Sequence, residues 1–101
     1  MPDEPAVFRY VVMYRMTEQG RRHAKDIVHH AQSIRDVNET AGFNVLGVYY
    51  THGQYDMVAI VEAPSEEAML TGLFSVAGEG NVVSETLRAY TPEEVQRAIG
   101  P

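Results

Sequence analysis

The sequence contains no cysteine and no tryptophan, and only one of its 101 residues is a lysine. Without cysteine the chain forms no disulfides, thiolate metal sites or iron–sulfur clusters, and it offers no cysteine nucleophile. A chain without disulfides fits a reducing compartment, so we expect a cytoplasmic location.

Positive charge is also scarce. Eight Lys and Arg residues stand against fourteen Asp and Glu residues, the formal net charge is −6, and no basic run is longer than Arg21-Arg22. Because phosphate backbones bind to clustered positive surfaces, we expect no nucleic-acid partner. No apolar run approaches the roughly 20 residues that span a bilayer, so no membrane partner is expected either.

The length predicts one domain over residues 1–101, in which the acidic, proline-rich residues 1–6 form a loose leader rather than a signal peptide. Segments rich in β-branched and aromatic residues predict four strands, at residues 7–16, 43–51, 55–63 and 82–90. Apolar residues spaced by three and four predict helices at residues 21–41 and 65–77, with Thr17 and Ser65 as N-caps. Residues 91–94 read Thr-Pro-Glu-Glu, which predicts the start of a short C-terminal helix.

This order predicts an α+β fold, the ferredoxin-like βαββαβ arrangement, in which two helices cover one face of an antiparallel four-stranded sheet. The first strand is apolar on both faces, with Tyr10 and Val12 on one and Val11 and Met13 on the other. Helices cover only one face, so we predict that a second copy of the chain covers the other. Two sheets stacked in this way form a dimeric α+β barrel, and we predict a homodimer or a larger homo-oligomer.

The histidines are the first candidates for chemistry. On a continuous helix His23 and His30 fall within the apolar arc, whereas His29 faces solvent. His23 and His30 are seven positions apart, which places them roughly 10 Å apart along the axis, too far to share one metal ion. Two interpretations stay open: both histidines find local hydrogen-bond partners at the edge of the packed face, or they line a pocket between helix and sheet. His52 joins such a pocket only if the fold brings the hairpin turn to the helix.

Six tyrosines are many hydroxyl groups for a small core, and four lie near strand ends: Tyr49, Tyr50, Tyr55 and Tyr90. A buried tyrosine needs a hydrogen-bond partner, so these residues suit a dimer interface or a cavity with polar edges. Asp56 directly follows the turn, where its carboxylate is expected to accept turn N–H groups.

Charged residues interrupt the predicted strands, namely Arg9, Arg15, Glu62, Glu85 and Arg88. Charges within a sheet are costly unless they are paired or lie at an open edge. They predict salt bridges between strands or subunits, or alternatively a cavity that recognises an anion. The sequence has no paired-carboxylate motif, nucleophile elbow, phosphate loop or HExxH helix, so its catalytic residues are unknown.

The segment Gly53-Gln54-Tyr55-Asp56, followed by residues 57–64, resembles the GYD domain family of small bacterial and archaeal proteins. Further segments match in order at residues 14–20, 47–50, 80–82 and 85–90, and the likeness covers residues 8–95. Gln54 stands at a variable position, and His52 departs from the small or aliphatic residue that the family often has. The resemblance implies a ferredoxin-like, dimeric α+β barrel, and it carries over no catalytic residues because the family has no agreed activity.

A more distant resemblance is to the effector-sensing domain of the Lrp/AsnC regulators, where a Gly-x-Tyr-Asp segment also leads into the third strand. In those domains the matching region lies near a subunit interface at which small molecules such as amino acids bind. The resemblance therefore implies that Gly53, Tyr55 and Asp56 form part of a pocket. Because the chain has no helix-turn-helix segment, it is expected to be a stand-alone sensing or binding module.

Three hypotheses follow. The first is an oligomeric module without enzymatic activity that binds a small molecule or a protein partner in a cavity at a subunit interface, with His23, His30, Tyr49, His52, Gly53, Tyr55 and Asp56 as candidate ligand contacts. The second is a cofactor-free α+β barrel enzyme, similar to monooxygenases or isomerases, in which histidine and tyrosine act as acid and base. The third is a haem or metal binder that uses one histidine as axial ligand.

Overall fold

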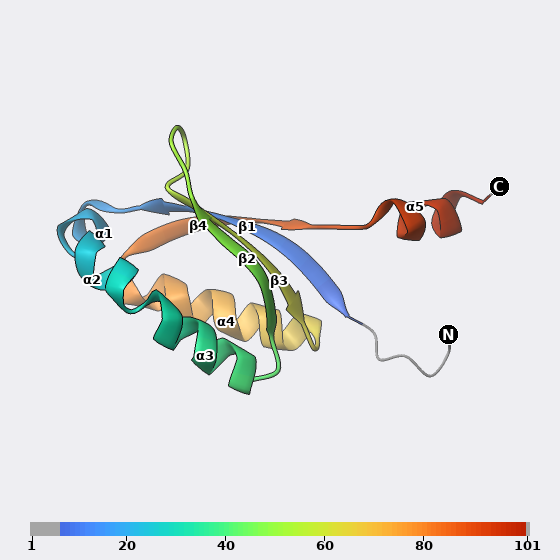
Figure 1. Ribbon diagram of the computed structural model, residues 1–101, viewed down its shortest axis with the longest axis horizontal. Coiled ribbons are helices and arrows are strands. Elements are labelled where there is room, and N and C mark those ends of the chain that lie inside the picture. The colour runs from blue at the N-terminus through green and yellow to red at the C-terminus, as the bar shows by residue number, and fades with distance from the viewer. Residues whose placement is uncertain (1–6, 101) are drawn as a thin grey trace.

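The computed structural model describes residues 7–100, so the predicted leader at residues 1–6 lies outside the described part of the chain. Four strands form one antiparallel sheet in the order β2-β3-β1-β4, with a single layer of helices on one face (Figure 1). The strands are β1 (Phe8–Met16), β2 (Asn44–Tyr50), β3 (Met57–Ala63) and β4 (Val82–Arg88). The predicted ferredoxin-like α+β fold is confirmed, and so is the hairpin that joins β2 to β3.

The predicted single helix over residues 21–41 is wrong. The structure has three short helices instead: α1 (Glu18–Arg22), α2 (Ala24–His29) and α3 (Ala31–Thr40), with His23 and His30 at the junctions. At the second junction the His30 ring nitrogen Nδ1 lies 2.7 Å from the Asp26 carbonyl, which also accepts the His30 backbone N–H. A side chain that competes for a helical carbonyl favours the end of the helix.

The residues that face the sheet differ from the predicted apolar stripe. The half-buried residues continue with a spacing of three and four across both junctions, and they are Ala24, Ile27, Ala31, Arg35 and Asn38. His23 and His30 are exposed rather than within the apolar arc, and Val37 is 68% exposed.

The helix starts agree with the sequence. Thr17 accepts a hydrogen bond from the Gly20 N–H at 3.1 Å, and Ser65 accepts one from the Ala68 N–H at 3.0 Å at the start of α4 (Glu66–Glu79). Thr91 and Glu94 form a reciprocal capping box at the start of α5 (Pro92–Ile99). These local hydrogen bonds satisfy N–H groups that have no partner within the helix.

The core lies between the sheet and α4. Val12, at the centre of β1, is 1% exposed and packs with Ala63 and Met69, while Phe43 and Leu73 close the cluster from the sides. Along each strand, the residues that face this core alternate with residues that face away from the helices, because successive side chains of a strand point to opposite sides.

A clasp of hydrogen bonds joins the β1–α1 connection to the α4–β4 turn. The Thr17 N–H donates to the Asn81 carbonyl at 3.0 Å, and the Thr17 hydroxyl donates to the Gly80 carbonyl at 2.7 Å. The Gln19 amide donates to the Glu79 carbonyl and to the Asn81 side chain, both at 3.0 Å. Buried Gly20 lies against this clasp, which ties together segments about 60 residues apart.

No described helix layer covers the second face of the sheet, which we call the open face (Figure 1). Its centre is apolar: Val11 pairs with Ile60 and Leu87, and Met13 pairs with Val58. Tyr49, opposite Val58, and Leu87 are about half exposed or more. The open face therefore presents apolar side chains on all four strands, with the charged residues Arg9, Glu62 and Glu85 beside them.

The strand charges have separate roles. Arg9 points from the open face and binds Glu62 of the neighbouring strand at 3.2 Å and Glu94 of α5 at 2.7 Å. This is the predicted salt bridge between strands. Arg88 does not follow that prediction: its guanidinium stacks over aromatic rings, 4.7 Å from the Tyr90 centroid and 5.2 Å from that of Phe8. These cation–π contacts, rather than an ion pair with a carboxylate, offset the cost of partly burying the Arg88 guanidinium.

The helix α5 extends away from the helix layer, beyond the end of the sheet (Figure 1). The radius of gyration is 15.1 Å, compared with about 13 Å for a compact domain of this length. Its attachment is the Arg9–Glu94 ion pair at the end of the open face, and Ile99 near its end is 76% exposed.

The attachment of α5 predicts a specific pH dependence. The Thr91 backbone N–H and the Arg9 guanidinium lower the pKa of Glu94 from 4.5 to about 2. Because this pKa is lower in the folded than in the unfolded protein, the stabilisation is fully present above pH ~4.5 and is lost as the pH falls towards ~2. We expect Glu94→Gln to have a lower melting temperature than the wild type near neutral pH, with a difference that shrinks over this interval.

The measurement is a series of thermal melts followed by circular dichroism. Glu93→Gln is the matched control, because Glu93 lies in the same first turn and has no recorded side-chain partner among the described residues. An equal pH dependence in the wild type and both variants would show that Glu94 does not hold α5.

Candidate functional site

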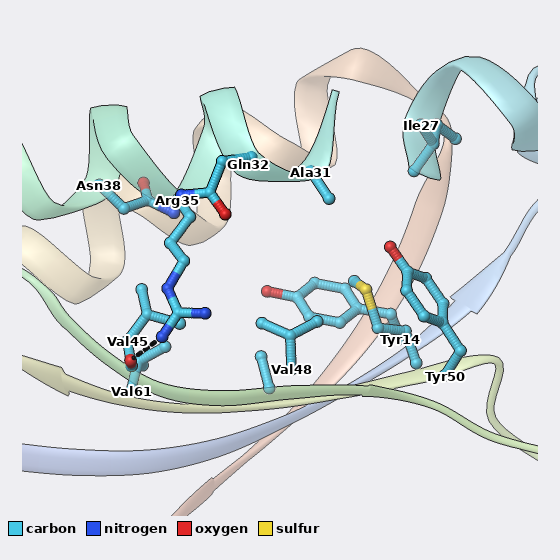
Figure 2. A pocket seen from close by; sticks show the side chains of 12 residues that line it. Tyr14, Ile27, Ala31, Gln32, Arg35, Asn38, Val45, Val48, Tyr50 and Val61 are labelled. Carbon is cyan, nitrogen blue, oxygen red and sulfur yellow. Dashed lines mark hydrogen bonds between the residues drawn. The ribbon is translucent and has the colours of Figure 1, made fainter. Parts of the chain in front are cut away.

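A cavity of about 260 Å³ lies between α3 and the sheet (Figure 2). Most of the wall is apolar and is formed by Ile27, Ala31, Val45, Val48, Met57, Ala59 and Val61. The polar part comprises Tyr14, Gln32, Arg35, Asn38 and Tyr50. An apolar cavity with a few polar groups is the usual form of a small-molecule site.

The cavity exists because α3 does not fill its half of the sheet. Ala31, Arg35 and Asn38 are spaced by four and three, so they lie on one side of the helix, and all three line the cavity. A small side chain and two polar ones occupy positions where a packed helix normally presents large apolar residues. On the other half of the sheet, α4 supplies Met69 and Leu73 to the core.

Arg35 is the charged residue of the cavity. One terminal nitrogen, Nη2, donates to the Val45 carbonyl at 2.9 Å, and Nε lies 3.8 Å from the Glu39 carboxylate. The hydrogen bond to the strand holds the guanidinium over the sheet. In Figure 2 its other terminal nitrogen points across the cavity, towards the hydroxyl of Tyr14.

Two tyrosines supply hydroxyl groups. Tyr14 extends along the cavity floor from β1, and burial raises the pKa of its phenol. Its hydroxyl therefore stays protonated and can donate a hydrogen bond at neutral pH. Tyr50 is about half exposed and stands at the rim, with its hydroxyl directed towards the helix side near Ile27 (Figure 2).

The histidines lie elsewhere. His23 and His30 are exposed at the two helix junctions, and His52 is exposed in the hairpin turn. The cavity wall contains none of them. The enzyme hypothesis requires a histidine beside a cavity, so the geometry of the described residues does not support it.

The hairpin residues gather on the other side of the sheet. The turn between β2 and β3, which contains Gly53 at φ +110°, rises on the side opposite the helices (Figure 1). The Tyr55 hydroxyl donates to Glu85 of β4, and this hydrogen bond raises the pKa of Tyr55. Together with Tyr49, these residues border the open face rather than the cavity.

Asp56 has a different partner from the one predicted. Its carboxylate accepts the Met16 N–H at 2.8 Å, and its own N–H donates to the Tyr14 carbonyl at 2.8 Å. Asp56 therefore attaches the end of the hairpin to the end of β1 instead of capping N–H groups within the turn.

The sequence predictions did not include the polar cavity residues on α3. The signal is present in the spacing of Ile27, Ala31, Arg35 and Asn38, which share one arc even on a continuous helix. The predicted inner side was drawn from apolar residues alone, so Arg35 and Asn38 were left out of it.

No group of three or more histidine, cysteine, aspartate or glutamate side chains within residues 7–100 is placed to hold a metal ion. None of the helices in the same part of the chain is long and apolar enough to cross a membrane.

The sheet order and the single helix layer define a ferredoxin-like α+β domain with a cavity under its first helical segment. The family model of the GYD domain matches residues 10–99, and the chain belongs to this family. It also resembles the crystal structure of the mycobacterial protein MtbAldR, an Lrp/AsnC-type regulator, with a TM-score of 0.66 and 13% identity.

That match covers 83% of this chain and 52% of the other, so the chain spans about half of the length of MtbAldR. At this identity the likeness concerns the fold. It agrees with the distant resemblance to the Lrp/AsnC regulators. The search of curated proteins found no match.

Proposed function

We propose that this chain is a small-molecule-binding module whose ligand occupies the cavity between α3 and the sheet. The observation that carries this proposal is the inner side of α3, where Ala31, Arg35 and Asn38 stand over an apolar floor. A helix that serves packing alone buries apolar residues at such positions, as α4 does. Polar side chains that converge on an unfilled apolar space are instead suited to orient a ligand.

The same proposal includes pairing of two copies through the open face. Its centre is apolar, and charged or hydrogen-bonded groups stand at its ends, with Arg9–Glu62 at one end and Tyr55–Glu85 at the other. An apolar centre with a polar rim is typical of protein interfaces. The helix α5 is tied to this side through Arg9, and the hairpin turn rises on it, so both are positioned to contact the second copy (Figure 1).

The ligand cavity and the pairing surface lie on opposite faces of the sheet. We therefore assign the ligand to the interior of each copy, rather than to a cavity at the subunit interface. The hairpin residues Tyr49, His52, Gly53 and Tyr55 are assigned to contacts between copies. A cytoplasmic location remains our expectation from the cysteine-free composition.

Filling the cavity tests the proposal. Ala31→Leu is expected to abolish ligand binding with little loss of stability, because the added carbons enter space that is already present. Ligand-detected NMR with a panel of small carboxylic acids, amides, amines and uncharged aromatic compounds would identify binders of the wild type.

Ala77→Leu is the matched control, since Ala77 is exposed on α4 and does not line the cavity. Binders that are lost in Ala31→Leu and retained in Ala77→Leu support the proposal. A panel in which no compound distinguishes the wild type from Ala31→Leu contradicts it.

A further inference from the structure

We infer that the ligand of this cavity is a small monocarboxylate with an apolar body and without a positively charged group. The inference rests on the proposed function, and it specifies the class of ligand. The charge of the wall, the direction of its donors and the size of the space favour such a ligand.

Charge is the first argument. Arg35 is the only charged residue among those that line the cavity, and no aspartate or glutamate of the described chain lines it. Its neighbour Glu39 lies 3.8 Å from Nε, and both side chains are well exposed, so this pair is weak. The guanidinium therefore retains positive potential towards the cavity, which favours an anion and disfavours a cation.

Two hydrogen-bond donors point into the same part of the cavity. The hydrogen bond from Nη2 to the Val45 carbonyl holds the guanidinium in one orientation, with the other terminal nitrogen directed into the cavity. The hydroxyl of Tyr14 approaches the same region from the floor (Figure 2). Two donors, one of them charged, match the two oxygens of a carboxylate, and hydrogen bonds to charged groups are stronger than neutral ones.

The rest of the wall defines the remainder of the ligand. Val48, Ala59 and Val61 form an apolar floor beside the donors, which suits a hydrocarbon chain or a ring. A space of about 260 Å³ with one cation is small for a nucleotide, whose phosphates need several positive groups. An α-amino acid is disfavoured as well, because its ammonium group would lack a carboxylate partner in the described wall.

The test uses three probes of nearly the same shape: phenylacetate, phenylacetamide and 2-phenylethylammonium. Dissociation constants are measured by NMR titration of the isotopically labelled protein. We expect phenylacetate to bind the wild type about tenfold more tightly than the amide, and the ammonium compound to bind most weakly. The preference should decline with added salt because an ionic contact is partly screened.

Variants show which residues cause the preference for the carboxylate over the amide. Arg35→Gln is expected to bring the acid and the amide to within about twofold of each other, whereas Arg97→Gln, which removes the same charge from exposed α5, keeps the difference. Tyr14→Phe is expected to weaken acid binding several-fold, because the aromatic ring stays and only the hydroxyl is lost. Arg35→Lys retains the charge and is expected to keep the order in which the three probes bind. This result would show that the loss of preference in Arg35→Gln is not caused by unfolding.

The possible failures are distinct. If acid and amide bind the wild type equally and Ala31→Leu blocks both, the carboxylate inference is wrong and the binding function stands. The same conclusion holds if the three probes fail but other compounds of the panel bind in the cavity. If no compound of the panel binds there, the binding function fails together with the inference.

Discussion

Replacing Gly20 with alanine is expected to lower the free energy of unfolding by about 3 kcal/mol. A Cβ atom at this position would lie 2.0 Å from the Asn81 carbonyl oxygen and 2.9 Å from its carbonyl carbon. Both are backbone atoms, so no side-chain rotation relieves the clash. Either α1 or the α4–β4 turn must move, and the movement breaks the clasp in which Thr17 donates to the Asn81 and Gly80 carbonyls.

The effect is measured by urea unfolding followed by circular dichroism. Gly78→Ala is the matched control, because Gly78 lies within α4 and an added Cβ meets no atom within 4 Å. Alanine is the better helix former, so this variant is expected to gain up to about 1 kcal/mol. If Gly20→Ala is as stable as the wild type, the close approach of α1 to the α4–β4 turn does not exist in solution.

If two copies pair through the open face as proposed, replacing Leu87 with lysine is expected to separate them and to raise the dissociation constant by at least about a hundredfold. Leu87 is 48% exposed on the open face and pairs with Val11 of the central strand. In a single copy the lysine head reaches water, so the fold tolerates it. In a face-to-face dimer the same residue enters the interface from both copies, where two unpaired ammonium groups lose their hydration.

Sedimentation velocity over a range of concentrations measures the association, and thermal melts confirm that each variant is folded. Val37→Lys is the control, because Val37 is even more exposed but lies on α3, on the helix side of the sheet. Equal dissociation constants for the wild type and Leu87→Lys would exclude the open face as the pairing surface. A wild type that is monomeric at all concentrations would do the same.

The cavity and the open face can be tested independently because they lie on opposite faces of the sheet. Ala31→Leu acts in the cavity, and Leu87→Lys acts on the open face. If ligand binding affects pairing, the effect must pass through the sheet, for example along β3, where Ala59 lines the cavity and the next residue, Ile60, lies on the open face. Titration of the Leu87→Lys variant with a cavity ligand would show whether one copy binds on its own.

Local signals in the sequence determined most of the fold. Strand composition, the caps at Thr17 and Ser65 and the capping box at Thr91 depend on neighbouring residues, so they can be read without a structure. The apolar residues on both faces of β1 likewise follow from its alternation, and they predicted a surface that the helices leave uncovered.

Tertiary structure decided the breaks in the first helical segment and which of its residues face the sheet. The His30 ring bound to the Asp26 carbonyl lies at the break between α2 and α3, Arg35 and Asn38 line the cavity over the sheet, and His23 and His30 are exposed. Tertiary structure also set the partner of Asp56, because Met16 is 40 residues away in the sequence. Helical spacing shows that Ala31, Arg35 and Asn38 share a side, but only packing shows that this side faces the sheet. The location of the cavity and the identity of its polar groups therefore depended on packing between distant segments, whereas the order of strands and helices was determined by the sequence itself.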